Sequence, residues 1–177
     1  MNQVLDEPIF GRVFNMEKND KIMGILWIDL TQFDELQVKQ IRLGLENELT
    51  MDHIQIYANP EFDSYQMSQI REGFVIGLTV DQVLVYAKPE FKDSQMIKIR
   101  NGFKYGLSME QIQVYAKPEF TAFQMEQIYL GFIHHLPMEW VLAYAKPEFT
   151  AFQMEQIRLD FGYGLSIEQA LDNAKHN

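Results

Sequence analysis

Few residues in this chain have the types and spacing that catalysis or metal binding requires. His134 and His135 are adjacent, so on a helix their side chains point about 100° apart and do not converge on one ion. His53 and His176 lie far from them along the chain, and there is no cysteine to supply a thiolate. Histidine and thiolate groups are the usual zinc ligands in proteins. We therefore expect no metal site.

Motifs for a nucleophile or for phosphate binding are missing as well. The stretch GYG at 162–164 follows no predicted strand, so it does not match a phosphate-binding glycine loop. Ser108 and Ser166 stand at predicted helix caps and not in a strand-to-helix elbow that would expose a nucleophile. The sequence thus predicts no catalytic residue and no cofactor, and we expect a protein that is not an enzyme.

The composition is typical of one folded domain. The chain has 177 residues, of which 47% are hydrophobic and 13% aromatic, a composition that disfavours disorder. The net charge of −10 argues against unaided binding to nucleic-acid phosphates or anionic membranes. The longest apolar run, Ile22–Ile28, is too short to span a bilayer. The first residues, MNQVLDEPIF, lack the basic and apolar segments of a signal peptide, so we expect a cytoplasmic protein.

A period of 29 residues runs through most of the chain. The stretch YAKPEFTAFQMEQI occurs at Tyr115–Ile128 and again, unchanged, at Tyr144–Ile157. The same offset gives rows of tyrosine, proline, phenylalanine and isoleucine; the tyrosine row is Tyr57, Tyr86, Tyr115 and Tyr144. A fixed period between about 20 and 50 residues is typical of stacked supersecondary units.

Cap and turn signals indicate that each unit is a pair of helices. Asp63 and Gln66 have the spacing of a capping box, and Thr79 and Gln82 repeat that spacing further on. Gly77, between the two, suits the left-handed residue that ends a helix. Each repeat is therefore predicted to be a long helix, a glycine turn and a shorter helix.

These units predict an all-α fold, a right-handed α-solenoid of about five 29-residue helix-turn-helix repeats. Residues 1–18 do not repeat and are predicted to form an N-terminal cap, and residues 19–177 a single helical-repeat domain. An additional helix capped by Asn19 or Asp20 would bring the total to roughly eleven helices. Lys92 occupies one cap position, so we expect Asp93 to shift that cap by one residue.

Two further rows call for a structural explanation. Glycine in mid-helix costs about 1 kcal/mol against alanine, so we expect a neighbouring helix to approach closely at Gly44, Gly73, Gly102 and Gly131. Asp160 breaks this row in the last repeat, where we expect no following layer to press on it. A second row aligns Tyr65, Phe123 and Phe152, and its helical spacing predicts core positions.

Two charged rows are open to two interpretations. Arginine recurs on the long helix and glutamate in the loop before it: Arg42, Arg71, Arg100 and Arg158, and Glu61, Glu90, Glu119 and Glu148. We favour ion pairs or hydrogen bonds that join helix to loop within each layer. The alternative is a ladder of ligand-binding groups.

One repeat departs from the pattern several times within twelve residues. Tyr129 replaces the row arginine, His135 the glycine, Pro137 the cap hydroxyl and Trp140 the glutamine. Loss of a C-cap glycine and of a cap hydroxyl costs on the order of 1 kcal/mol each, and Tyr and Trp are common interface anchors. The candidate partner-binding residues are therefore Tyr129, His134, His135, Pro137 and Trp140. The alternative is neutral drift, with Pro137 as a first-turn proline and Trp140 packing locally.

The phrases YAKPEF, QMEQIRLDF and YGLSIEQ resemble short helical repeats in uncharacterised proteins of Gram-positive bacteria and their mobile elements. The resemblance covers residues 28 to 174. As a class these repeats are similar to tetratricopeptide and Sel1-like arrays, although the period here is shorter. The resemblance implies a binding scaffold, and it implies no catalytic residues.

Three functions follow from these observations. The favoured one is a scaffold that binds a protein or peptide partner, and the mobile-element resemblance suggests a host defence or regulatory protein. A second is an acidic mimic of nucleic acid that inhibits a nuclease, and a third, least favoured, is direct RNA binding. Association with a second copy of the chain stays open. The distribution of charge on the folded surface separates these functions, because mimicry needs a dense acidic stripe and RNA binding needs a basic groove.

Overall fold

The computed structural model describes residues 28–175, and within them all regular structure is helical. The chain clusters into two compact units, Met1–Gln32 and Phe33–Asn177. In the first unit the described part contains one short 3-10 helix, η2 (Leu30–Gln32). The predicted N-terminal cap and the helix predicted to begin at Asn19 or Asp20 lie outside the described residues. Across residues 28–175 no helix is both long enough and apolar enough to cross a bilayer.

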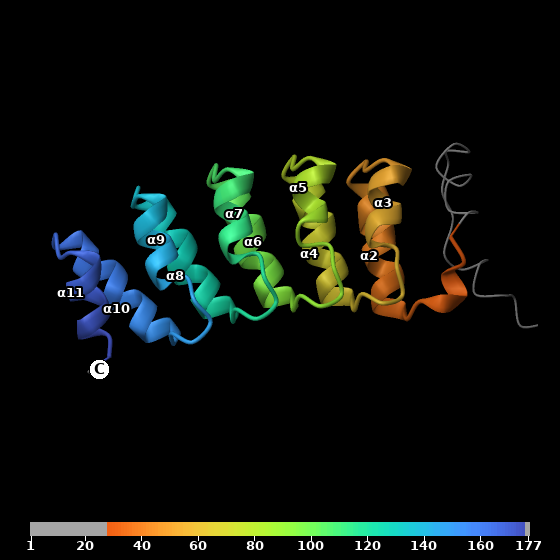
Figure 1. Ribbon diagram of the computed structural model, residues 1–177. Coiled ribbons are helices and arrows are strands. Elements are labelled where there is room, and N and C mark those ends of the chain that lie inside the picture. Colours follow the sequence, from red (N-terminus) through yellow and green to blue (C-terminus); the bar gives the residue numbers. More distant parts are fainter. Residues whose placement is uncertain (1–27, 176–177) are drawn as a thin grey trace, which may run out of the picture. The chain divides into compact units, whose positions relative to one another are not determined.

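The second unit alternates long and short α-helices, as Figure 1 shows. The long helices have twelve residues each: α2 (Glu35–Glu46), α4 (Ser64–Val75), α6 (Asp93–Lys104), α8 (Ala122–Ile133) and α10 (Ala151–Gly162). The short ones are α3 (Met51–Tyr57), α5 (Val80–Leu84), α7 (Met109–Tyr115), α9 (Met138–Tyr144) and α11 (Ile167–Asn173). For residues 28–175 the predicted all-α class is confirmed. Below, a long helix together with the short helix after it is called a hairpin.

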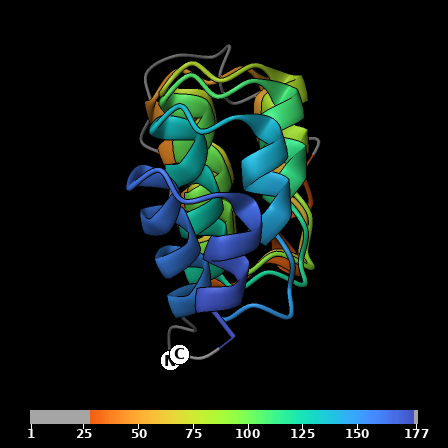
Figure 2. The same cartoon turned by 60° about the vertical axis from the view of Figure 1, so that its left-hand side comes forward.

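Consecutive long helices pack directly against one another, from α2 through α4, α6 and α8 to α10. Each short helix packs against its own long helix, and α3, α7 and α9 also pack against the long helix that follows. In Figure 2, which brings the α10–α11 side forward, long helices form one column and short helices another. The long helices thus present one continuous side of this unit.

Capping boxes begin α2, α4, α8 and α10, and in the first three of these helices the capping-box glutamine also bonds the loop that leads to the next hairpin. At α4, Asp63 Oδ1 accepts from the Gln66 backbone N–H at 2.8 Å, and Gln66 Oε1 accepts from the Asp63 N–H at 2.9 Å. The remaining amide group, Gln66 Nε2, donates to the backbone oxygens of Phe91 at 2.6 Å and Pro89 at 3.0 Å in the next loop. The sequence predicted the caps, but not this second bond, which recurs at Gln95 and Gln124.

The predicted cap shift at α6 is wrong. Lys92 itself is the N-cap residue, Asp93 is the first helical residue, and no side-chain oxygen caps the helix. Gln95 Oε1 still accepts from the Lys92 N–H at 2.8 Å. Because the Gln95 amide also donates to the next loop, the position of this glutamine fixes the helix start even without a capping oxygen.

The mid-helix glycines accommodate tyrosine hydroxyls and not the backbone of a neighbouring helix. A Cβ atom built on Gly73 would overlap the Tyr86 hydroxyl oxygen, and Gly44, Gly102 and Gly131 meet the tyrosine of their own hairpin in the same way. The Tyr86 hydroxyl donates to the Gln69 backbone oxygen at 3.5 Å. Burial raises the pKa of these tyrosines above the ordinary value, so they stay protonated: Tyr57, Tyr86, Tyr115 and Tyr144.

Asp160 is explained by a contact within the last hairpin and not, as expected, by the lack of a following layer. Asn173 occupies the tyrosine position of the last hairpin, and its Nδ2 donates to Asp160 Oδ2 at 2.9 Å. The glycine is therefore absent because its tyrosine partner is absent, and both changes occur within one hairpin. Glycine and tyrosine form a complementary pair along the array.

Candidate protein-binding surface

Four of the most exposed apolar side chains lie at the second position of the long helices. This N-terminal row consists of Leu36, Tyr65, Phe123 and Phe152, which are 56% to 72% exposed, with Ser94 in the same position on α6. The prediction that Tyr65, Phe123 and Phe152 are core residues is wrong. Tyr65 lies nine residues before the buried Phe74, which is about 180° around the helix. The loop phenylalanines Phe62 and Phe91, by contrast, are buried in the core.

A second exposed row lies at the C-cap of each long helix. It contains Tyr163, which is 81% exposed, together with the exposed Ile76 and Tyr105. Eleven residues separate the two rows on each helix, which corresponds to three turns and an offset of only about 20°. Both rows therefore lie on one side of the long helices, called here the exposed face. The C-cap row is Asn47, Ile76, Tyr105, His134 and Tyr163.

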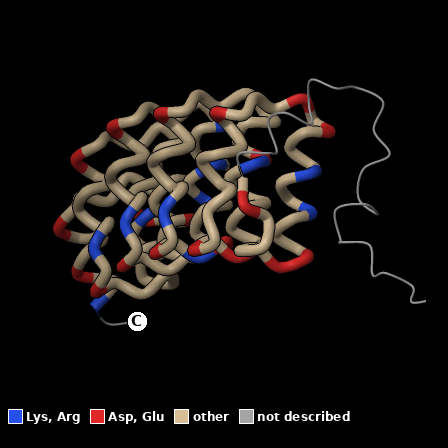
Figure 3. Tube along the Cα trace, turned by 90° about the vertical axis from the view of Figure 1, so that its right-hand side faces the viewer, with Lys and Arg blue, Asp and Glu red and all other residues tan. Residues whose placement is uncertain are grey.

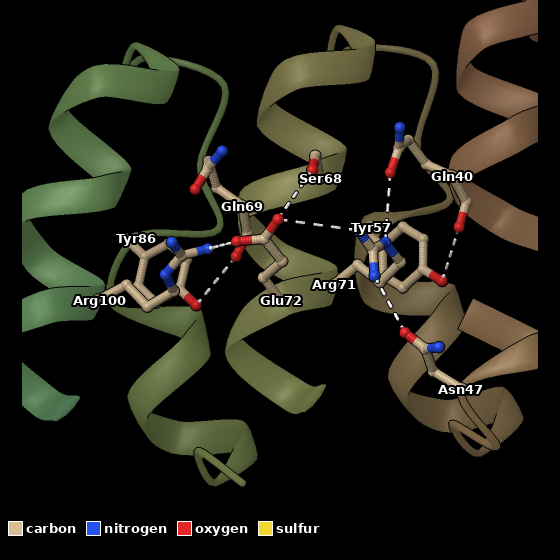
Figure 4. A network of polar contacts seen from close by, with 9 residues as sticks. All are labelled: Gln40, Asn47, Tyr57, Ser68, Gln69, Arg71, Glu72, Tyr86 and Arg100. Carbon is tan, nitrogen blue, oxygen red and sulfur yellow. Dashed lines mark hydrogen bonds and ion pairs between the residues drawn. The ribbon is translucent and has the colours of Figure 1, made fainter. Parts of the chain in front are cut away.

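Between the two rows, arginines join consecutive long helices (Figure 4). Arg71 on α4 donates to Gln40 Oε1 at 3.2 Å and to Asn47 Oδ1 at 3.1 Å on α2. Arg100 on α6 forms an ion pair with Glu72 on α4. No ion pair within residues 28–175 involves a loop glutamate. The expected helix-to-loop pairing is wrong, and the arginines stabilise the array between hairpins.

Tyr129 replaces the row arginine at a place where the preceding long helix carries a lysine and not the glutamine that partners the arginine elsewhere. Arg71 and Arg158 bind a glutamine 31 residues earlier, and that position before Tyr129 is Lys98. The Lys98 ammonium instead forms an ion pair with Glu126 at 3.0 Å. Tyr129 is 8% exposed and stacks on Tyr105, with ring centroids 6.4 Å apart. An arginine at 129 would lie beside the Lys98 charge, so the tyrosine fits its neighbours.

The other four candidate residues lie around the turn between α8 and α9. His134 is the C-cap of α8, and its Nδ1 lies 3.3 Å from Arg158 NH1. His135 takes the left-handed conformation at φ 60°, and Pro137 is the N-cap of α9 without a side-chain hydrogen bond. Trp140 packs on Phe161 of α10, with ring centroids 4.8 Å apart.

The structure therefore divides the predicted patch. His134, His135, Pro137 and Trp140 share one turn, and of these His134 and Trp140 contact the following helix, α10. Tyr129 contacts Tyr105 and Tyr115 of the preceding hairpin instead. Trp140 and Phe161 have counterparts three repeats earlier in His53 and Phe74. These two rings stack, with centroids 4.4 Å apart.

Charge differs between the two ends of the hairpins. The turn edge, defined as residues 46–53, 75–82, 104–111, 133–140 and 162–169, contains one lysine, Lys104, and these carboxylates: Glu46, Glu48, Asp52, Asp81, Glu110, Glu139 and Glu168. The loop edge, residues 58–63, 87–92, 116–121 and 145–150, contains lysines and acidic residues in similar number. Figure 3 shows acidic residues following one another along one edge and both signs along the other.

Neither edge presents an arrangement of metal ligands. Within residues 28–175 no group of three or more His, Cys, Asp or Glu side chains is placed to hold a metal ion. The chemistry of the surface is that of exposed aromatic rings, aliphatic groups and carboxylates. Comparison of the chain with protein-family models, with curated proteins and with solved structures gives no match.

Proposed function

We propose that this protein is an α-solenoid of about five 29-residue repeats that binds a protein or peptide partner on the exposed face of its long helices. The binding needs no chemistry from the chain itself, so the proposed role is that of a scaffold and not of an enzyme. Helical repeat arrays bind partners along extended surfaces of this kind, a fold-level analogy that the surface itself must justify.

The repetition of exposed aromatic side chains is the observation that supports the proposal. Scattered apolar residues are normal on a protein surface, whereas contiguous apolar patches mark interaction sites. Here Phe123 and Phe152 occupy the same position on adjacent helices, α8 and α10, which pack directly against each other. Aromatic residues are enriched in the buried centres of interfaces. The N-terminal row therefore supplies ready anchors for a partner.

The distribution of charge favours this function over nucleic-acid mimicry. Duplex DNA has about one phosphate charge per 1.7 Å, or roughly six per 10 Å. The acidic row at the start of the short helices provides one carboxylate per hairpin: Asp52, Asp81, Glu110, Glu139 and Glu168. Because packed helices lie about 10 Å apart, this row is several times too sparse to imitate a duplex.

A display-library selection of peptides against the purified chain tests the proposal. The Phe123→Ser/Phe152→Ser variant removes two anchors, and the chain itself places Ser94 at that position, so serine is compatible with the helix start. The matched control is Leu84→Gln/Leu142→Gln. These leucines are exposed on the short helices, where the chain also uses Gln55 and Gln113.

We expect the serine variant to bind the selected peptides about tenfold more weakly, a loss of about 1.4 kcal/mol, and the control to bind like the native chain. Failure to select any peptide would contradict the proposal. So would equal binding by the native chain and the serine variant, since the anchors would then be dispensable.

A further inference from the structure

Resting on the proposed binding function, we propose further that the partner is a basic peptide segment seated along the C-cap row. In this arrangement its cationic side chains recur at every third position. The proposal names the charge, the location and the spacing of the bound segment.

The apolar part of this surface lies at the C-terminal ends of the long helices. Ile76, Tyr105 and Tyr163 are exposed C-cap residues, and Val75 and Val80 are exposed beside Ile76. A tyrosine ring attracts a guanidinium or ammonium group placed over its face. The aliphatic groups suit the hydrocarbon stems of lysine and arginine side chains, which pack on apolar surface while the charge stays in water. Both features fit a cationic segment.

Carboxylates accompany this apolar row along the turn edge. Each acidic residue at the start of a short helix follows its C-cap residue by five positions, as Asp81 follows Ile76 and Glu110 follows Tyr105. All of the turn-edge carboxylates are exposed, and none takes part in an ion pair within residues 28–175. Their charge is thus available to a partner, with Lys104 as the opposing charge on this edge.

The loop edge does not offer the same complementarity. On the loop edge, each of Glu90, Glu119 and Glu148 follows a lysine by two residues, as Glu119 follows Lys117. A basic segment there would meet charges of both signs. The turn edge combines apolar groups with one dominant sign, and opposite charge on the partner both accelerates association and selects against wrong partners.

The spacing of the hairpins determines the period of the ligand. Packed helices lie about 10 Å apart, and three residues of an extended chain span roughly 10 Å. A polyproline II helix has three residues per turn and a rise of about 3.1 Å per residue, so every third side chain points the same way at nearly the hairpin spacing. A segment with Lys or Arg at positions i, i+3, i+6 and i+9 therefore places one cation at each successive hairpin.

Fluorescently labelled peptides of about twelve residues, long enough to span roughly 40 Å, test the inference by anisotropy. One peptide has arginine at every third position among proline and alanine, and a second has the same composition with its arginines adjacent. The variant Asp81→Asn/Glu110→Gln/Glu139→Gln removes three turn-edge charges. The control Glu90→Gln/Glu119→Gln/Glu148→Gln removes the same net charge from the loop edge.

We expect the periodic peptide to bind the native chain about tenfold more tightly than the clustered one. We also expect the turn-edge variant to lose about tenfold in affinity and the loop-edge variant to lose far less. Equal binding of the two peptides, or equal losses in the two variants, would overturn the inference, because the attraction would then be non-specific. Circular dichroism of both variants verifies that they are folded.

The display selection separates this inference from the proposed function. Selected peptides that lack basic residues and still need Phe123 and Phe152 would overturn the basic partner and leave the scaffold function standing. Selected peptides that have a three-residue basic period and also need Phe123 and Phe152 would support both.

Discussion

Single residues in this array are matched to a partner elsewhere in the fold, and the glycine–tyrosine pair is the simplest example. Tyr86 packs where a Cβ of residue 73 would lie, so Gly73 costs helix propensity and allows a buried hydroxyl to reach the Gln69 carbonyl. At the last hairpin the pair becomes Asp160 and Asn173, joined by a hydrogen bond. Both solutions keep the short helix close to its long helix.

The substitution Gly73→Ala should destabilise the protein by about 1–3 kcal/mol, the usual cost of overpacking, despite a gain in helix propensity of about 1 kcal/mol. Adding Tyr86→Phe removes the hydroxyl that the new methyl group would meet, so the double variant should be more stable than the sum of the single changes predicts. Urea unfolding of all four proteins measures this coupling. A neutral or stabilising Gly73→Ala would contradict the pairing.

A second residue pair lies between hairpins. Because Lys98 precedes Tyr129 at the arginine–glutamine offset, Tyr129→Arg should lower the free energy of unfolding by on the order of 1 kcal/mol through like-charge repulsion. Combining it with Lys98→Gln should recover the part of the loss that is due to repulsion, since the pair seen at Arg158 and Gln127 would be restored, while the ring contacts of Tyr129 stay lost. A double-mutant cycle measured by chemical denaturation gives the coupling, and additive effects would show that the two positions are independent.

At the scale of the helices, local cap signals set the helix starts, while contacts distant in sequence join the hairpins. The capping boxes at Asp63 and Thr79 formed as predicted because both partners lie within one helical turn. The contacts of Arg71 were not predicted because its partner Gln40 lies on another helix. The loop glutamates carry the opposite charge and are closer to the arginines in the sequence, so they were the expected partners. The joint change of Lys98 and Tyr129 was a signal of this contact that the sequence did contain.

For the exposed aromatic row, the sequence predicted the alignment of the residues but not their exposure. Spacing by whole repeats shows that Tyr65, Phe123 and Phe152 are equivalent, but not whether they face inward. The angle from Tyr65 to the core residues of α4 would have placed it outside. Burial of Met67, Ile70 and Phe74 leaves Tyr65 on the opposite side of the same helix.

Gln66 both caps its helix and bonds the next loop, whereas Gln82 only caps its helix, so the two glutamines can be compared. Gln66→Ala removes a cap bond and the bonds to the next loop, so we expect a loss of about 2 kcal/mol in unfolding free energy. Gln82 at the start of α5 accepts from the Thr79 N–H, and Gln82→Ala should cost only about 0.5–1 kcal/mol. Equal losses in thermal or urea unfolding would show that the bond between hairpins contributes little.

For the helical unit as a whole, the buried tyrosine row couples stability to alkaline pH. Burial raises the pKa of Tyr57, Tyr86, Tyr115 and Tyr144 in the folded state. Their contribution to stability is therefore complete below the unfolded-state pKa of about 10 and declines as pH rises toward the folded-state value.

We expect these tyrosines to ionise together with the loss of helical structure above about pH 10. Tyrosine absorbance and circular dichroism followed in one alkaline titration measure both events. Ionisation of the whole tyrosine complement with full helical content would contradict the assigned burial.

The measurement that bears most directly on the binding function is a nuclear magnetic resonance titration of the isotope-labelled chain with the tightest selected peptide. We expect the shifts to concentrate on the exposed face, at Tyr65, Phe123 and Phe152 and along the C-cap row, with Leu84 and Leu142 on the short helices unaffected. Shifts concentrated on the short helices, with the aromatic rows unmoved, would contradict the assignment of the long-helix face as the binding surface.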